Sequence, residues 1–330
     1  MAQTNKPLYK HYLDAFAHPG EQQFRDAVAG FIAPDAKMNV VHPFNDMSGA
    51  DYFDTFIASL LGSFDGLHRR DYLLTEGGFE GGDWVSSTGY YVGHFKRDWL
   101  GIKASDALQY LRVGEFHRIE NGRSVEAYIY LDIPELMISV DQWPELESPA
   151  VVPGYTGMIP GPATSDGLDL SPRDPVLSQS SLKIVTQMLD GLATKDEAWR
   201  PFWHENMMWY GPGAFGSFIG VDNFHAFQVP FEGLFSHWIG GSKEGSETRH
   251  FTRHGDGNYV CSGGWPSLNA HQIKPFLSQP ATNKTLYMRV CDWWRREDDL
   301  LVENWVFVDI PHVLLQMGYD LFAEISRQQK

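Results

Sequence analysis

One acidic residue, Asp292, stands in surroundings that could support proton transfer. It lies in an apolar segment, two residues after Val290 and directly before Trp293 and Trp294. In a strand, alternate side chains face opposite sides of the sheet. Burial in an apolar pocket raises the pKa of a carboxyl group, which suits a general base near neutral pH. The alternative is an outward-facing or hydrogen-bonded structural acid.

Two polar residues could bind a substrate oxygen beside this carboxylate. The imidazole of His271 can donate to, or accept from, such an oxygen, although a histidine in a strand can also be structural. Asn304 is a second candidate, and its neighbour Glu303 faces the opposite side of the strand. The sequence leaves open which face is concave. We expect Glu303 to form a structural ion pair with Arg289 or Arg295.

The chain repeats itself at long range. Residues 94–134 align with residues 271–311 at a constant shift of 177 without a gap, and 13 of the 41 positions are identical. This period is far longer than that of a solenoid unit, so the repeat predicts two copies of one domain. The candidate residues of the first copy are Glu115 (at the position of Asp292), His94 (at that of His271), His117 and Tyr128.

Each copy shows helical patterns first and strand patterns afterwards. In the first copy, apolar spacing predicts two helices over 7–33, a strand at 37–42 and a helix at 50–62. Strands are expected at 68–77, 83–93, 107–119 and 123–132, with Pro134 opening a helical turn. The second copy predicts helices at 176–193, 196–203 and 221–234, strands at 206–210, 247–256, 258–269, 284–296 and 300–309, and a last helix from Pro311.

This order predicts two α+β domains, at residues 1–140 and 176–330. Residues 141–175 contain seven prolines, too many for a helix or a central strand, and form the expected linker. At this length the linker should pack against one or both domains. In each domain, helices packed on a strongly curved, mostly antiparallel sheet would leave a concavity that can serve as a small-molecule pocket.

The composition argues against several classes of binding partner. The net charge of −16 disfavours nucleic acid and anionic membrane surfaces, which need basic patches. No run of about 18 apolar residues predicts a membrane span, and the absence of a visible secretory signal favours a cytoplasmic address. The 14% aromatic content is consistent with an apolar cavity in each copy. Two cysteines allow neither a disulfide framework nor a Cys-rich metal site.

The histidines do not predict a metal site. His250 and His254 are four residues apart in a strand-like segment, where such positions lie about 13 Å apart. The chain has no HExxH motif and no P-loop or GxGxxG spacing. We therefore expect neither a metal nor another cofactor.

Several motifs of the second copy occur together in one known family. They are Gly264-Trp265-Pro266-Ser267, Asn269-Ala270-His271, Arg289-Val290-Cys291-Asp292-Trp293-Trp294-Arg295 and Val302-Glu303-Asn304-Trp305. The first copy has a weaker version in Arg112-Val113-Gly114-Glu115-Phe116 and Arg118-Ile119-Glu120-Asn121-Gly122. With these motifs the chain resembles the SnoaL-like polyketide cyclases, also called ester cyclases, of the nuclear transport factor 2-like superfamily.

The resemblance implies two cone-shaped domains with a pocket on the inner face of each sheet, and cofactor-independent acid/base chemistry. In the family's cyclases a paired His and Asp handle a proton next to a carbonyl group. The position of that His holds Glu115 and Asp292 here, and the position of that Asp holds Ile129 and Val306. An acidic residue in place of the His could still take a proton.

We therefore expect cyclisation, isomerisation or hydration of a small apolar carbonyl compound, with the better site in the second copy. The alternative is a small-molecule-binding protein without catalysis. The resemblance also implies an intramolecular pseudo-dimer, with a homodimer possible. The expected catalytic residues are Asp292, His271 and Asn304, and the expected pocket residues are Trp265, Asn269, Trp294, Trp305, His204 and Tyr210.

Overall fold

The computed structural model describes residues 4–194, 197–240 and 247–328, which form two compact units. Unit 1 comprises Met1–Gln142, Pro160–Pro172 and Asp320–Lys330. Unit 2 comprises Trp143–Ile159 and Arg173–Tyr319. The expected linker is thus divided between the two units, and the C-terminal end of the chain joins the first.

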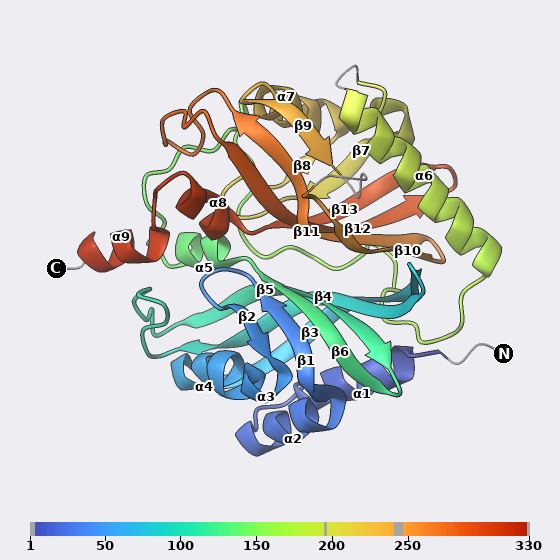
Figure 1. Cartoon of the computed structure of the whole chain (residues 1–330), viewed down its shortest axis with the longest axis vertical. Helices are drawn as coiled ribbons and strands as arrows, with labels where there is room; N and C mark the ends of the chain where they lie inside the picture. Colours follow the sequence, from blue (N-terminus) through green and yellow to red (C-terminus); the bar gives the residue numbers. More distant parts are fainter. Residues whose placement is uncertain (1–3, 195–196, 241–246, 329–330) are drawn as a thin grey trace. The chain divides into compact units, whose positions relative to one another are not determined.

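Unit 1 consists of a six-stranded sheet and short helices. The sheet has the strand order β2-β1-β6-β5-β4-β3, with all neighbours antiparallel except β1 and β6. Figure 1 shows α1 to α4 gathered on one side of it. The elements are α1 (Lys6–Ala15), α2 (Glu21–Phe31), β1 (Ile32–Val40), β2 (Asn45–Ser48), α3 (Gly49–Tyr52), the π-helix η1 (Phe53–Ile57), α4 (Ala58–Ser63), β3 (Phe64–Phe79), β4 (Gly82–Phe95), β5 (Leu108–Glu120), β6 (Arg123–Leu131), α5 (Ile133–Ser139) and α9 (Leu321–Gln328).

Unit 2 has the same plan. Its sheet order is β10-β11-β12-β13-β7-β8, with β9 paired to β11 and only β13 and β7 parallel. Helices α6 and α7 lie on one side of this sheet (Figure 1). The elements are α6 (Pro175–Thr194), the 3-10 helix η2 (Arg200–Phe202), β7 (Trp203–Tyr210), β8 (Phe218–Ile219), α7 (Val221–Glu232), β9 (Phe235–Gly240), β10 (His250–Asp256), β11 (Tyr259–Gln272), β12 (Thr285–Glu297), β13 (Leu300–Val308) and α8 (Ile310–Gln316).

The sequence repeat corresponds to a structural repeat. Each boundary of β4, β5, β6 and α5 reappears 177 residues later in β11, β12, β13 and α8. Arg112 lies on β5 and Arg289 at the equivalent place on β12. Each sheet is mixed, because one parallel pair accompanies the antiparallel ones, so the predicted α+β class of two tandem copies is confirmed. The predicted helix at 196–203 is wrong: its described part is the turn η2, and Trp203 already pairs with Leu301 of β13.

The repeated Asp-Ile-Pro sequence has a structural explanation. Asp132 and Asp309 are the N-cap residues of α5 and α8, and each carboxylate accepts a backbone N–H three residues ahead. Proline is favoured in the first turn, where its missing N–H has no helical partner to lose. Arg112 and Arg289 form ion pairs with these carboxylates, at 3.7 and 3.0 Å. These identical residues therefore preserve the join between strand and helix.

Two segments outside the repeat pack within unit 1. In residues 160–172, the carbonyl of Gly167 accepts the N–H of Leu74 at 2.8 Å. In helix α9, Leu321 and Ile325 are buried, and the ring of Phe322 lies 5.6 Å from that of His42. The compact units thus differ from the expected bounds 1–140 and 176–330. Across the described part of the chain, every helix is too short or too polar to cross a bilayer.

Candidate functional site

Unit 2 contains a cavity of about 400 Å³ between its sheet and its helices. One wall comes from α6 and α7, and the other from β7 and from strands β10 to β13. Apolar and aromatic side chains dominate the lining, which is the usual character of a small-molecule site. They include Trp203, Trp209, Phe224, Phe227, Phe231 and Trp294.

A row of four directly opposed residues crosses the sheet at this cavity. Arg253 on β10 pairs with Ser262 on β11, Ser262 with Asp292 on β12, and Asp292 with Val306 on β13. Opposed residues of neighbouring strands point to the same face of a sheet. All four line the cavity, and the Arg253 Nε–H donates to Ser262 Oγ at 3.3 Å. The row therefore places a cation, a hydroxyl and a carboxylate side by side in an apolar enclosure.

Asn304 supports the carboxylate of this row. Its Nδ2 donates to Asp292 Oδ1 at 3.4 Å and to the backbone carbonyl of Trp293 at 3.0 Å. Asn304 lies opposite Trp294, and both line the cavity. The amide thus fixes the orientation of a carboxylate that lies next to a tryptophan ring.

Beside the row, His250 orients Arg253. His250 Nε2 lies 3.2 Å from Arg253 Nη2 and 3.1 Å from Ser267 Oγ. Because arginine cannot accept a hydrogen bond, Nε2 must be the acceptor, and the imidazole is neutral with its hydrogen on Nδ1. Burial, reinforced by the Arg253 charge, lowers the pKa of His250 to about 3. Burial also lowers the pKa of Arg253, against the opposing charges of Asp292 and Asp190.

Strand alternation decides which predicted residues reach the cavity. On β13, Asn304 and Val306 face it, whereas Glu303 and Trp305 face the other side. On that side Glu303 forms an ion pair with Arg295, which was one of its two predicted partners. Asp292, Asn304 and Trp294 are the predicted residues that line the cavity.

The other predicted pocket residues lie outside the described lining. On β11, Leu268 faces the cavity, so Asn269 and His271 point away from it. His271 is partly exposed, with its ring 6.4 Å from that of His237. Trp265 lies under the Arg289 guanidinium at 4.1 Å.

On β13, Trp305 stacks on Tyr210 of β7, with ring centroids 5.4 Å apart, on the face of the sheet away from the cavity. His204 lies on β7 and accepts the backbone N–H of Asn206 at 3.1 Å. Asp292 lines the cavity, whereas His271, His204 and Tyr210 are not part of its described lining.

Sequence reasoning missed four polar residues on the sheet wall of the cavity: His250, Arg253, Ser262 and Ser267. A usable signal was the turn at 256–258. Counting back from the pair Asp256 and Tyr259 puts Arg253 opposite Ser262. Ser267 falls within an irregularity of β11 between Gly264 and Leu268, which no period-2 pattern predicts.

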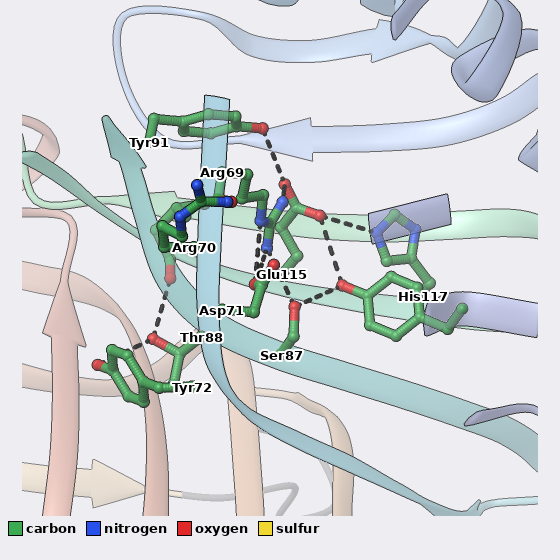
Figure 2. A network of polar contacts seen from close by, with 11 residues as sticks. Arg69, Arg70, Asp71, Tyr72, Ser87, Thr88, Tyr91, Glu115 and His117 are labelled. Atoms are coloured by element: carbon green, nitrogen blue, oxygen red, sulfur yellow. Dashed lines mark hydrogen bonds and ion pairs between the residues drawn. The ribbon is translucent and has the colours of Figure 1, made fainter. Parts of the chain in front are cut away.

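Unit 1 has a related polar cluster at the equivalent position (Figure 2). Glu115 on β5 lies opposite Ser87 on β4, as Asp292 lies opposite Ser262. An arginine from the preceding strand again joins them. Arg69 Nη1 lies 2.5 Å from Glu115 Oε1, and Arg69 Nη2 donates to Ser87 Oγ at 3.0 Å.

A bulge in β3 allows this convergence. The register shifts between Asp71 and Leu73, which keeps Arg69 and Asp71 on the same face as Ser87. Gly89 lies opposite Asp71, where a Cβ atom would sit 2.2 Å from the Arg70 carbonyl oxygen. The lack of a side chain at Gly89 therefore leaves room for the bulge.

Unlike the unit 2 site, this cluster is sealed. The side chains of Glu115 and His117 have no exposed surface, and Tyr9, Tyr12 and Phe31 surround the imidazole at ring distances of 5.1 to 5.9 Å. Burial by itself would raise the pKa of Glu115. The Arg69 charge, with a hydrogen bond from His117, instead lowers it to about 2. Glu115 is therefore an ion-paired structural carboxylate.

The remaining first-copy candidates lie apart from Glu115. His94 is exposed on β4. The Tyr128 hydroxyl donates to Glu126 at 2.7 Å, and its ring lies 6.3 Å from that of Trp84. Among the residues that the structure describes in either unit, no three His, Cys, Asp or Glu side chains converge as a metal site.

Three solved structures similar to this chain each correspond to less than half of it. One is described as a SnoaL-like polyketide cyclase from Jannaschia sp. CCS1, with 16% identity and a TM-score of 0.38 over 45% of this chain and 97% of its own. A nuclear transport factor 2-like protein from Burkholderia xenovorans has 13% identity and a TM-score of 0.33 over 42% and 96%. A third, described as a hydroxylase from Streptomyces galilaeus, has 11% identity and a TM-score of 0.36 over 43% and 97%.

At these identities the likeness concerns the fold. No family model matches the chain, and no curated protein matches it. The function is therefore argued from the residues of the cavity.

Proposed function

We propose that unit 2 binds a small, largely apolar carbonyl compound and moves a proton at the carbon next to its carbonyl group without a cofactor. The observation that carries this proposal is the row Arg253, Ser262 and Asp292 on the cavity face of the sheet. It offers a proton acceptor and a cation within one apolar enclosure. Such an enclosure strengthens electrostatic interactions by excluding water.

In the proposed reaction, Asp292 takes the proton from the α-carbon and becomes a neutral carboxylic acid. The electron pair of the broken C–H bond moves to the carbonyl oxygen and forms an enolate. Isomerisation follows if Asp292 returns the proton to another carbon. Ring closure follows if the enolate carbon attacks a second carbonyl of the same molecule, and Asp292 then protonates the new alkoxide. Asn304 keeps the carboxylate oriented in either case.

The direct test is Asp292→Asn, which keeps the shape of the side chain and removes the base. With 2-tetralone as probe, the exchange of its α-protons with deuterated water can be followed by NMR. We expect a loss of about 100- to 10,000-fold in the protein-catalysed rate, the usual contribution of a general base. Glu115→Gln is the matched control and should keep the rate of its folded fraction. Full exchange activity in Asp292→Asn would eliminate Asp292 as the base.

A binding protein without catalysis is the second candidate function. Val306 supports it, because this residue lies opposite Asp292 where the resemblance places a second catalytic acid. Tight binding of carbonyl compounds with no exchange above background would favour this alternative. Quenching of cavity tryptophans such as Trp294 provides the binding measurement.

Cytoplasmic location and an intramolecular pseudo-dimer stay predictions. Light scattering tests the assembly, for which we expect a mass of one chain, or of two if homodimers form. Halves of the chain that are each stable and monomeric would contradict the pseudo-dimer.

A further inference from the structure

Arg253 is placed to bind the oxygen on which negative charge develops. We infer that Arg253 is the oxyanion-binding residue of the unit 2 cavity, and that the substrate is an uncharged, enolisable ketone about two fused rings in size. This inference rests on the proposed function and adds the electrophilic residue and the substrate class.

The guanidinium is held in a defined orientation. Its Nε–H donates to Ser262 Oγ at 3.3 Å and its Nη2 donates to His250 Nε2 at 3.2 Å. Because the guanidinium is planar, two such bonds fix the directions of its other N–H groups. Since the Arg253 side chain lines the cavity, these groups are available for a ligand oxygen there.

The partner that orients Arg253 carries no charge. Neutral His250 accepts a hydrogen bond without cancelling the positive charge of the guanidinium. The contrast is Arg69 in unit 1, which lies 2.5 Å from Glu115 and 2.9 Å from Asp71 and is paired with both. An arginine that is held by a neutral imidazole keeps its full positive charge for an anionic ligand.

Proton transfer in this site moves charge without creating it. Arg253 and Asp292 are separated by two strand spacings, about 10 Å between their Cα atoms, with only Ser262 between them. Both side chains extend into the same cavity, so the α-carbon of a ketone can lie at Asp292 while its oxygen lies at Arg253. When Asp292 becomes neutral, its charge passes to that oxygen. The total charge facing Arg253 therefore stays constant, which keeps the barrier low.

Size and charge define the substrate class. An apolar cavity of about 150 Å³ holds benzene, so a cavity of about 400 Å³ has room for a bicyclic compound. Asp190, Glu232 and Asp292 also line the cavity, against the one cation Arg253 among the described lining residues. This excess of acidic groups opposes a substrate that already carries a carboxylate. An uncharged ketone avoids that cost and acquires its charge only at Arg253.

The test uses 2-naphthol as a stable mimic of the enolate. The probe is bound to Asp292→Asn, because the neutral asparagine has the same charge as Asp292 after proton transfer. Absorbance of the bound probe should show the pKa of its hydroxyl lowered by about one unit or more from its value in water. Adding Arg253→Gln should abolish this shift, and Arg253→Lys should retain part of it, since lysine keeps the charge but not the fork. 2-Methoxynaphthalene cannot ionise and should bind all three proteins within about threefold.

An unshifted naphthol in Asp292→Asn, or an equal shift after Arg253→Gln, would overturn the inference. If the Arg253→Gln derivative no longer binds 2-methoxynaphthalene, this substitution has damaged the cavity. The pKa shift in the Arg253→Lys derivative then serves as the test. A bound naphthol that is unshifted in both Asp292→Asn and its Arg253→Lys derivative refutes the role of Arg253. The proposed function fails separately, if 2-tetralone exchange survives in Asp292→Asn. Tighter binding of 2-naphthoate than of 2-methoxynaphthalene would contradict the uncharged substrate class.

Discussion

Glu115 in unit 1 and Asp292 in unit 2 occupy the same position of the repeat, and each faces a serine on the neighbouring strand. In both units an arginine from the strand before donates to that serine. The environments differ. Glu115 has no exposed surface and is paired with Arg69, whereas Asp292 borders a cavity of about 400 Å³.

The elements outside the aligned repeat make this difference. In unit 1, α1 and α2 bring Tyr9, Tyr12 and Phe31 against His117, and the Tyr9 hydroxyl lies 3.4 Å from Glu115. In unit 2 the helices α6 and α7 border the cavity instead, and Trp294 stands where unit 1 has His117. Repeated strands thus preserve the position of a carboxylate, while the helices decide whether it is sealed or accessible.

The comparison predicts its largest stability effect at Glu115. Glu115→Gln leaves the Arg69 charge buried with weaker compensation, and breaking a buried ion pair costs about 3–5 kcal/mol. We expect a loss of this size in the free energy of unfolding, measured by urea denaturation. Asp292→Asn, at the equivalent position, should change it by about 1 kcal/mol or less. Equal losses in the two variants would show that both carboxylates are structural.

Acid should affect the two units over different pH ranges. His250 has a folded-state pKa of about 3, below its usual value, so the unfolded chain takes up a proton that the folded chain does not. This contribution to stability is complete above about pH 6.5 and falls as the pH drops toward 3. Glu115, with a pKa lowered to about 2, loses its contribution only below about pH 4.5.

His250→Gln should therefore flatten the decline in stability between pH 6.5 and 4.5, by up to about 3 kcal/mol at the lower pH. Asp190 and Asp292 are the acidic groups that act on the neighbouring Arg253, and the variant and wild type share both. Thermal unfolding at a series of pH values measures the slope. An unchanged slope would show that His250 does not govern the acid response.

Helix α9 tests the assignment of the C-terminal end to unit 1. Ile325 is 3% exposed, and Ile325→Ala should cost about 2 kcal/mol or more through lost burial and the cavity left behind. Hydrogen exchange should become faster around Gly101, which lies against Ile325 and Ser326. Strands β11 to β13 should stay protected as in wild type. Faster exchange confined to unit 2 would refute this assignment.

The smallest effect concerns a repeated ion pair. Arg118 and Glu126 are 3.0 Å apart with side chains 30% and 24% exposed, so Glu126→Gln should cost at most about 1 kcal/mol. The equivalent Arg295 and Glu303 are each 5% exposed. Glu303→Gln should cost about 1–3 kcal/mol, because it weakens a buried charge-assisted bond. Double-mutant cycles with the arginines measure the pair energies, and equal energies would show that burial does not separate them.

Much of the fold could be predicted from the sequence, because the repeat is a local pattern copied at a fixed distance. The shift of 177 assigned β11, β12 and β13 to β4, β5 and β6. It also marked Asp292 as a strand residue among aromatic neighbours, and Glu303 as the partner of Arg289 or Arg295. These features depend on residues close together in the chain or on an internal repeat that aligns without a gap.

The site depended on contacts that no local pattern encodes. A period of two separates the faces of β13 but does not say which is concave, since Asn304 and Trp305 are both buried. His271 points away because the β11 irregularity and its alternation follow from pairing with β9 and β12. Arg253 comes onto the same cavity face as Asp292 only through the pairing of three strands, β10, β11 and β12.

The sealing of Glu115 was equally invisible, because the rings that enclose it come from α1 and α2, about 80 to 110 residues earlier in the chain. The sequence by itself thus determined two copies, their strands and a carboxylate at one repeated position. Only the tertiary structure decided which carboxylate is sealed and which is accessible. The physical reason is that burial is set by whatever packs over the sheet, and in each unit those helices lie outside the repeat.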